Sequence, residues 1–166
     1  MAKKLSISKS DGQQLSIIGL TSLANDYRLL YFAGKALNFS FTRLEDLPLF
    51  GKKDKLGDFS FYHYFQEDTR LNYFLFANKN NEQIAITSFR NFDYFLIISG
   101  ELNLKFESKL IKLLRTIPVV QAVIPIPSSG VKDIEYLLED IEMHLVALKL
   151  TKKHKQGQWV VNTSSL

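Results

Sequence analysis

The hydrophobic positions of this chain are concentrated in one stretch near its middle, and the elements predicted there organise the others. Phe92–Ser99 is a run of eight mostly aromatic or aliphatic residues without proline, and both of its faces are largely apolar. Such a run predicts a central strand that is covered on both sides. After Gly100 the apolar residues take helical spacing as far as Ile117, and Pro118 ends that helix. Val119–Ile124 predicts a second strand, which we expect to pair parallel to another strand of the sheet through a right-handed crossover.

A short strand and an amphipathic helix are predicted before this stretch. Leu15–Leu20 has strand composition, and Thr21 or Ser22 is placed to cap the helix that follows. The apolar residues expected on one buried face of this helix are Leu23, Tyr27, Leu30, Tyr31 and Leu37. Gly34 lies inside the helix and destabilises it unless a neighbouring backbone packs closely against it.

The middle of the chain predicts an antiparallel meander. Residues 39–42 alternate as a short strand, 49–58 have loop composition, 59–66 and 71–77 form a hairpin, and 84–86 form a further short strand. The predicted fold is therefore α+β, with a mixed, largely antiparallel sheet of six or seven strands, two packed helices and an additional C-terminal helix. The strand–helix–strand unit also looks like half of a ferredoxin-like, small-molecule-sensing module, by analogy of fold alone.

Residues 131–150 predict a long C-terminal helix with one continuous apolar stripe. The stripe consists of Ile134, Leu137, Leu138, Ile141, Leu145 and Leu148. It is longer than one domain face needs to cover, so two interpretations stay open. The stripe either packs in the core, or it leaves apolar surface for a second copy or another protein partner.

Length and composition limit the class of protein. A chain of 166 residues favours one domain, which we place at residues 14–150, with a frayed N-terminus at 1–13 and a polar C-terminal tail at 151–166. The absence of cysteine excludes disulfides and thiolate catalysis. No apolar run reaches the roughly 18 residues of a membrane span, and the N-terminus lacks the apolar segment of a secretion signal, so we expect a cytoplasmic protein without membrane contact.

The charge pattern makes nucleic acid a possible partner. The formal net charge is +4, and the basic residues gather in three places. These are Lys3, Lys4 and Lys9; Lys52, Lys53 and Lys55; and Lys149, Lys152, Lys153, His154 and Lys155. One hypothesis is that Lys52, Lys53 and Lys55 bind phosphates while Tyr62 and Tyr64 stack bases. The alternative is that the lysines are solvated and the tyrosines take part in cross-strand aromatic packing.

Four residues are candidates for binding a small ligand. They are Arg28, His63, Asp93 and Tyr94. The carboxylate of Asp93 either accepts backbone N–H groups or an arginine, which would be structural, or acts as a general base. His63 is either a partly buried ring with satisfied hydrogen bonds or a base. His144 is expected to form a surface pair with Asp140, four residues earlier.

Neither a metal site nor a cofactor site is predicted. The three histidines lack the spacing of metal ligands, and the eight glycines form no phosphate-binding loop. We assign no catalytic residue from the sequence.

One stretch resembles a known signature. Ile86–Tyr94 is similar to the sequence that names the IPExxxVDY family of small bacterial proteins, which reads Ile-Pro-Glu, three variable residues, then Val-Asp-Tyr. Ile86, Asp93 and Tyr94 match, Phe92 substitutes for Val, and Thr87 and Ser88 replace the Pro and Glu, so any role of those two is not carried over. The likeness extends over roughly residues 15–127. It implies a bacterial, cytoplasmic setting and no particular activity.

Three functions follow from these observations, in order of preference. The first is a non-catalytic interaction or ligand-binding module that self-associates. The second is an RNA- or ribosome-associated binding protein. The third is a small-molecule enzyme that uses His63 or Asp93, and an open pocket lined by neither residue would remove its basis.

Overall fold

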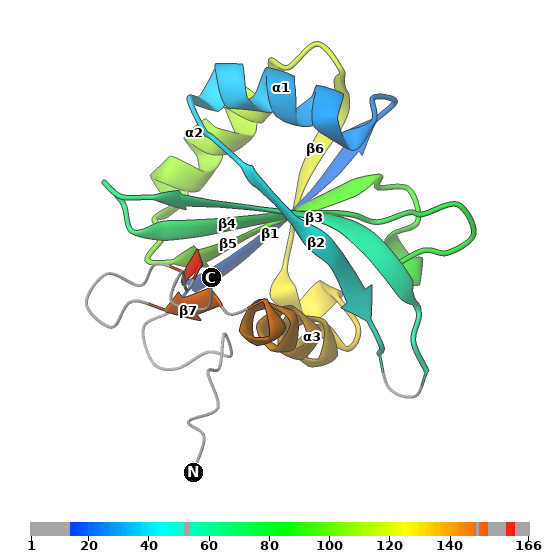
Figure 1. The fold of residues 1–166 in the computed structure, drawn as a ribbon. Coiled ribbons are helices and arrows are strands. Elements are labelled where there is room, and N and C mark those ends of the chain that lie inside the picture. Colours follow the sequence, from blue (N-terminus) through cyan, green and yellow to red (C-terminus); the bar gives the residue numbers. More distant parts are fainter. Residues whose placement is uncertain (1–13, 52–53, 149, 153–158, 162–166) are drawn as a thin grey trace.

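One six-stranded sheet, covered by helices on both faces, forms the framework of the protein (Figure 1). The computed structural model describes residues 14–51, 54–148, 150–152 and 159–161. In spatial order the strands are β2 (Thr42–Leu49), β3 (Gly57–Gln66), β4 (Leu71–Ala77), β5 (Tyr94–Gly100), β1 (Gln14–Ser22) and β6 (Val120–Ile126). The helices are α1 (Asp26–Leu37), α2 (Leu104–Arg115) and α3 (Ile134–Ala147). The predicted α+β fold is confirmed.

The helices divide into two layers. Figure 1 shows α1 and α2 on one side of the sheet and α3 on the other. Two short 3₁₀ helices, Thr87–Phe89 and Ser128–Gly130, lie in connections. Beyond α3, β7 (Leu150–Lys152) pairs antiparallel with β8 (Trp159–Val161). No helix in the described part of the chain combines the length and the apolar character that crossing a membrane requires.

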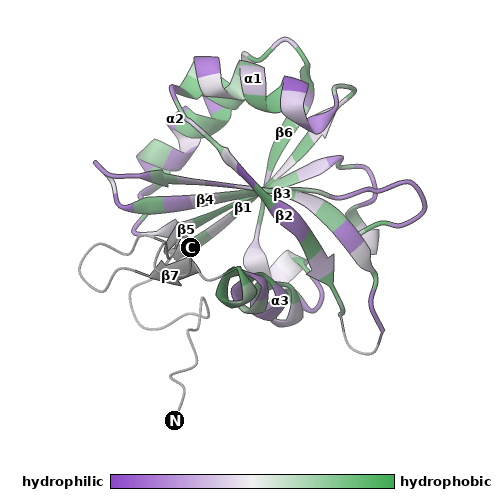
Figure 2. Ribbon diagram, viewed as in Figure 1, coloured by the Kyte–Doolittle hydropathy of each residue, from purple (hydrophilic) through white to green (hydrophobic). Residues whose placement is uncertain are grey.

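The central position predicted for the strand before Gly100 is confirmed. β5 lies between β4 and β1, and its side chains alternate between two separate hydrophobic clusters. Phe95 and Ile97 pack on the α3 side, whereas Leu96 and Ile98 pack on the α1–α2 side. Hydrophobic residues predominate in the strands at the centre of the sheet (Figure 2). A strand that is buried on both faces needs apolar residues at consecutive positions, and this is the pattern that identified β5.

The predicted parallel pairing of the strand after α2 is wrong. β6 pairs with β1, and both β1 ladders are antiparallel, as are all the other ladders of the sheet. β1 lies between β5 and β6, so β5 and β6 run in the same direction without touching. The arrangement is the split β-α-β unit of ferredoxin-like sheets. The hydrophobic pattern of β6 contains no information on which strand becomes its neighbour.

Two short strands were misplaced by the sequence. The strand expected at residues 39–42 begins at Thr42 and extends to Leu49 as β2, with an irregularity in its register between Leu44 and Leu47. Residues 84–86 form a single bridge, between Lys79 and Ile84, and then enter the 3₁₀ helix. The β-propensity of residues 84–86 is high, but propensity does not show that only one of these residues pairs with another part of the chain.

The buried face of α1 agrees only in part with the predicted one, since Leu30 and Leu37 pack against the core but the other three residues do not. Leu29 and Ala33 are buried, whereas Leu23, Tyr27 and Tyr31 are 88%, 70% and 58% exposed. The small side chain of Ala33 and the aliphatic side chain of Leu29 pack against the sheet, and the bulky tyrosines are left in solvent.

The predicted cap of α1 is also wrong. Asn25 caps the helix by accepting a hydrogen bond from Arg28 N. The Ser22 hydroxyl instead donates to the carbonyl oxygen of Val119. The expectation for Gly34 is confirmed, because a Cβ atom there would lie 2.9 Å from the carbonyl oxygen of Phe39.

The apolar stripe of α3 lies in the core. Leu137, Leu138, Ile141 and Leu145 are buried against the sheet, as the core interpretation requires. The large apolar residues of α3 that remain exposed are Tyr136, Met143 and Val146. Self-association through the 131–150 helix stays a prediction.

Candidate functional site

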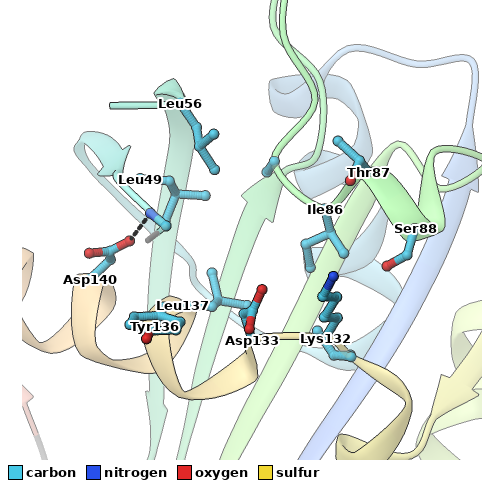
Figure 3. A pocket seen from close by; sticks show the side chains of 13 residues that line it. Leu49, Leu56, Ile86, Thr87, Ser88, Lys132, Asp133, Tyr136, Leu137 and Asp140 are labelled. Atoms are coloured by element: carbon cyan, nitrogen blue, oxygen red, sulfur yellow. Dashed lines mark hydrogen bonds between the residues drawn. The ribbon is translucent and has the colours of Figure 1, made fainter. Parts of the chain in front are cut away.

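A cavity of about 320 Å³ opens beside the N-terminal half of α3 (Figure 3). We call it the α3 cavity. Three segments line it: the end of β2 with the connection that follows, the segment around the first 3₁₀ helix, and the start of α3. The lining residues are Leu49, Gly51, Leu56, Ala85, Ile86, Thr87, Ser88, Val131, Lys132, Asp133, Tyr136, Leu137 and Asp140. Parts of the chain separated by up to 91 positions in the sequence therefore meet at one site.

The floor of the α3 cavity is apolar. Leu49, Ile86, Val131 and Leu137 are all buried, and all belong to the hydrophobic cluster on the α3 side of the sheet. Within the described residues α3 is the one helix on this face, whereas α1 and α2 share the other. A single helix does not cover the whole width of the sheet, and the cavity is the space left beside it.

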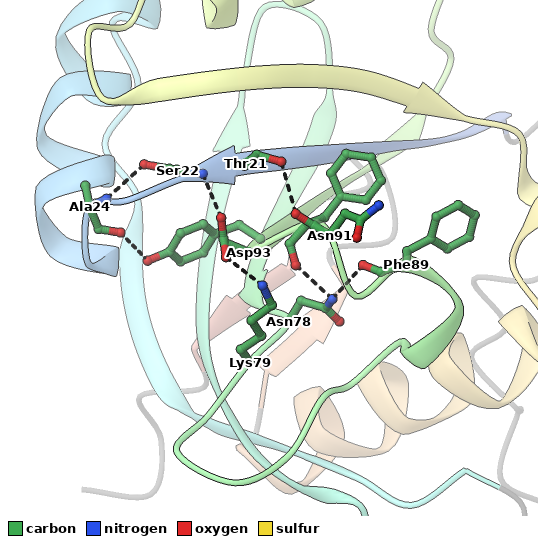
Figure 4. A network of polar contacts seen from close by, with 10 residues as sticks. Thr21, Ser22, Ala24, Asn78, Lys79, Phe89, Asn91 and Asp93 are labelled. Carbon is green, nitrogen blue, oxygen red and sulfur yellow. Dashed lines mark hydrogen bonds and ion pairs between the residues drawn. The ribbon is translucent and has the colours of Figure 1, made fainter.

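Asn78 holds the wall formed by residues 85–88 in place. It is completely buried, and its Oδ1 atom accepts a hydrogen bond from Ile86 N at 2.8 Å. Its Nδ2 atom donates to the carbonyl oxygens of Phe89 and Phe92 (Figure 4). Its backbone also pairs with Ala85 and Asp93. The amide side chain of Asn78 thus supplies the hydrogen bonds that a neighbouring strand would otherwise give to residues 86–92.

Asp140 closes the opposite wall. Its Oδ2 atom accepts hydrogen bonds from Phe50 N at 2.9 Å and Gly51 N at 3.4 Å, where β2 leaves the sheet. Burial raises the pKa of Asp140, and these two hydrogen bonds only partly oppose the rise. A carboxylate half-removed from water needs such N–H donors.

The surface pair predicted between Asp140 and His144 is wrong. His144 is buried, and its Nε2 atom donates a hydrogen bond to the carbonyl oxygen of Glu45, at 2.8 Å, in the irregular part of β2. His144 therefore bonds to a backbone group of the edge strand β2, whereas Asp140 bonds to the two residues that follow this strand. His144 thus supplies a hydrogen-bond partner that an edge strand otherwise lacks.

The mouth of the α3 cavity carries charges of both signs. Lys132 and Asp133 are exposed, and Figure 3 shows both side chains directed toward the segment that holds Ile86 and Ser88. Thr87 and Ser88 supply exposed hydroxyl groups on that side. An apolar floor below a polar, charged mouth can bind a molecule that has an apolar body and polar ends. No group of acidic, histidine or cysteine residues in the described ranges is suited to hold a metal ion.

The four predicted ligand-binding residues do not meet in the structure, and none of them lines the α3 cavity. Arg28 is exposed on α1. Asp93 accepts a hydrogen bond from Ser22 N at 2.9 Å and forms an ion pair with Lys79 at 3.0 Å (Figure 4). The Tyr94 hydroxyl donates to the carbonyl oxygen of Ala24. Asp93 therefore has the structural role predicted as one alternative, with Lys79 in place of an arginine.

His63 lies on the other face of the sheet from Tyr94. Its ring stacks on Phe74, with the centroids 5.0 Å apart, and its Nε2 atom lies 3.0 Å from Asn72 Oδ1. Burial lowers the pKa of His63, although the contact with Asn72 opposes this. These contacts match the structural alternative for His63, a buried ring with a hydrogen-bond partner.

The residues predicted to bind nucleic acid are not arranged for stacking. Tyr62 is buried, and its hydroxyl donates to Asp26 Oδ2 at 2.7 Å. Tyr64 packs against Phe39 with ring centroids 4.5 Å apart. Lys55 pairs with Asp58. Lys52 and Lys53 lie outside the described residues, as do the N-terminal lysines and the basic residues after α3.

Sequence reasoning did not identify the α3 cavity. Its polar residues come from segments that carry no shared motif, and Thr87, Ser88 and Lys132 have no special spacing. The one local signal is the break in hydrophobic pattern just before α3. Comparison of the chain with family models and with curated proteins found no match, and the likeness to the IPExxxVDY family stays a prediction.

Proposed function

We propose that the protein is a non-catalytic binding module and that its ligand binds in the α3 cavity. The observation that carries this proposal is the cavity itself, which joins an apolar floor to a charged mouth. Its volume of about 320 Å³ is at the lower end of the range of small-molecule sites. Neither His63 nor Asp93, the residues of the predicted enzyme, lines this cavity, so a catalytic role for them stays a prediction.

The charges at the mouth suggest the class of ligand. Lys132 and the hydroxyls of Thr87 and Ser88 suit a carboxylate, whereas Asp133 suits an ammonium group. The apolar floor formed by Leu49, Val131 and Leu137 suits an aliphatic or aromatic body. Amino acids with apolar side chains combine these three features, so we propose a zwitterion of this kind as the ligand.

An NMR titration tests the proposal. We would add L-phenylalanine and L-leucine to ¹⁵N-labelled protein and follow the amide signals. We expect shifts at residues 85–88 and 131–137 and none on α1. 3-Phenylpropionate and phenethylamine, which each lack one of the two charges, should bind more weakly than L-phenylalanine.

Two variants and one control complete this test. Lys132→Gln should weaken L-phenylalanine about tenfold, because one hydrogen bond to a charged group is lost. Ser88→Trp should block the mouth and abolish the shifts; both positions are exposed, so folding is retained. Tyr31→Ala, on the other side of the sheet, should change nothing. Shifts that are absent at millimolar ligand, or that survive Ser88→Trp, would contradict the proposal.

A further inference from the structure

The outer faces of the two helical layers carry opposite charge. α2 has four basic residues and one acidic residue, whereas α3 has four acidic residues and no lysine or arginine. α1 adds Arg28 and Lys35, and its acidic residue, Asp26, is tied to the hydroxyl of Tyr62. Of the two helical layers, the one formed by α1 and α2 is therefore the basic one.

The basic residues share this face with exposed tyrosines. We define the α1–α2 surface by its exposed tyrosine and basic residues, which are Tyr27, Arg28, Tyr31, Lys35, Lys105, Lys109 and Lys112. Because both helices bury their other side against the same sheet face, these side chains point away from the sheet in the same direction. Arg115 is left out because its Nη2 atom donates to the carbonyl oxygen of Val123.

The residues form two rows. Tyr27, Tyr31 and Lys35 follow one another at four-residue spacing along α1, and each step advances about 6 Å. The second row, along α2, consists of Lys105, Lys109 and Lys112. The ammonium group of Lys35 lies 4.6 Å from the centre of the Tyr31 ring, so a cation and an aromatic face meet on the surface.

We propose that the α1–α2 surface binds single-stranded RNA. Proteins that bind single strands combine a line of cations for the phosphates with aromatic rings on which bases stack. Here the lysines of α2 supply the first, and Tyr27 and Tyr31 supply the second. The tyrosine hydroxyls beside these cations suit hydrogen bonding to the ribose 2′-hydroxyl. This site is separate from the α3 cavity and from the residues that the sequence suggested for nucleic acid.

Other anionic partners fit this surface less well. A helix that lies on a membrane inserts large apolar side chains between its cations. On the α1–α2 surface the exposed residues beside the cations are the tyrosines of α1 and, on α2, the small polar Ser108. The exposed leucines of this layer lie at or before the helix starts: Leu23 precedes α1, and Leu104 is the first residue of α2. A second copy that presented its acidic α3 would match the charge but would leave the tyrosine rings without bases to stack on.

Fluorescence anisotropy of a labelled oligouridine 12-mer tests the proposal in the full-length protein. We expect binding at 50 mM salt that weakens steeply as the salt concentration rises. The variant Lys105→Gln/Lys109→Gln/Lys112→Gln should lose at least tenfold in affinity. The slope of log K against log salt should become shallower by about 2, since three phosphate contacts are removed.

The tyrosines are tested separately from the charges. Tyr27→Ala/Tyr31→Ala should weaken binding at least fivefold with an unchanged salt slope, whereas Tyr27→Phe/Tyr31→Phe should retain stacking and most of the affinity. All of these positions are exposed, and thermal melting checks that each variant is folded. Lys132→Gln/Tyr136→Ala, on the α3 side, is the matched control and should bind like the wild type.

Four results would overturn the proposal. The first is no binding of oligouridine at 50 mM salt. The second is an equal loss in the α3 control. The third is binding of phosphatidylglycerol vesicles, but not of oligouridine, that depends on the three lysines. The fourth is a mass, measured by light scattering without RNA, that falls when these lysines are replaced, since this would assign the surface to a second copy.

Discussion

The two faces of one sheet are covered in different ways, and the contrast explains where the protein has room for a ligand. On one face α1 and α2 lie side by side and seal the sheet with Leu29, Ala33, Leu110 and Leu114. On the other face α3 is the one helix among the described residues, and the α3 cavity remains beside it. The face covered by α1 and α2 carries a charged outer surface, whereas the face covered by α3 has a cavity.

The largest effect is expected from breaking the wall of the α3 cavity. Asn78→Ala should lower the free energy of unfolding by about 4 kcal/mol, because the buried groups of Ile86, Phe89 and Phe92 lose their hydrogen-bond partner. Urea denaturation measures this change. The exposed neighbour Asn81→Ala serves as the control and should alter stability by less than about 0.5 kcal/mol. A small loss for Asn78→Ala would show that the wall does not depend on this amide.

A matched pair of core substitutions compares the two layers directly. Leu145→Ala in α3 and Leu114→Ala in α2 remove the same atoms from buried positions, and each should cost about 3 kcal/mol. We expect Leu145→Ala to cost more, since α3 has no neighbouring helix on its face. Chemical denaturation of both variants tests this order. A larger loss for Leu114→Ala would contradict the view that α3 is the less supported layer.

A smaller effect should appear when the pH is lowered. Burial lowers the pKa of His63 below its ordinary value of 6.5, so the unfolded chain binds a proton that the folded chain resists. Stability should therefore be complete above pH 6.5 and should decrease as the pH falls below it. Denaturation midpoints between pH 5 and 8 measure this. His63→Gln should remove the dependence, and a slope that persists in this variant would assign it to another group.

The smallest expected effect is the pH dependence of stability contributed by one carboxylate in each layer, Asp26 in α1 and Asp140 in α3. Burial raises the pKa of Asp26, but hydrogen bonds led by the one from Tyr62 outweigh this and leave the pKa lowered, so its contribution should be lost as the pH falls below 3.8. Burial leaves the pKa of Asp140 raised, so its ionisation should decrease stability as the pH rises above 3.8. Acid titrations of Asp26→Asn and Asp140→Asn should change the slope in opposite directions. Changes in the same direction would contradict the assignment.

The elements that could be read from the sequence are those whose burial is complete on one side or on both. β5, α2 and α3 follow their hydrophobic patterns closely, because a buried face admits few polar residues at any position. α1 was predicted as a helix, but Tyr27 and Tyr31 were placed on its buried face, because the ring of a tyrosine is apolar although its hydroxyl is polar. Hydrophobicity alone does not distinguish a tyrosine that packs from one that faces water.

The order of the strands and the α3 cavity were decided by tertiary structure. β1 lies between β5 and β6 because a sheet places its doubly apolar strands inside, but no local pattern specifies which of them become neighbours. The cavity depends on segments brought together by that order and on the side chain of Asn78, whose role is invisible until its partners are known. The sequence by itself determined the helices, the buried strands and the balance of charge, since these follow from local composition. The sites on the surface depend on distances between remote residues, and only the folded chain sets those distances.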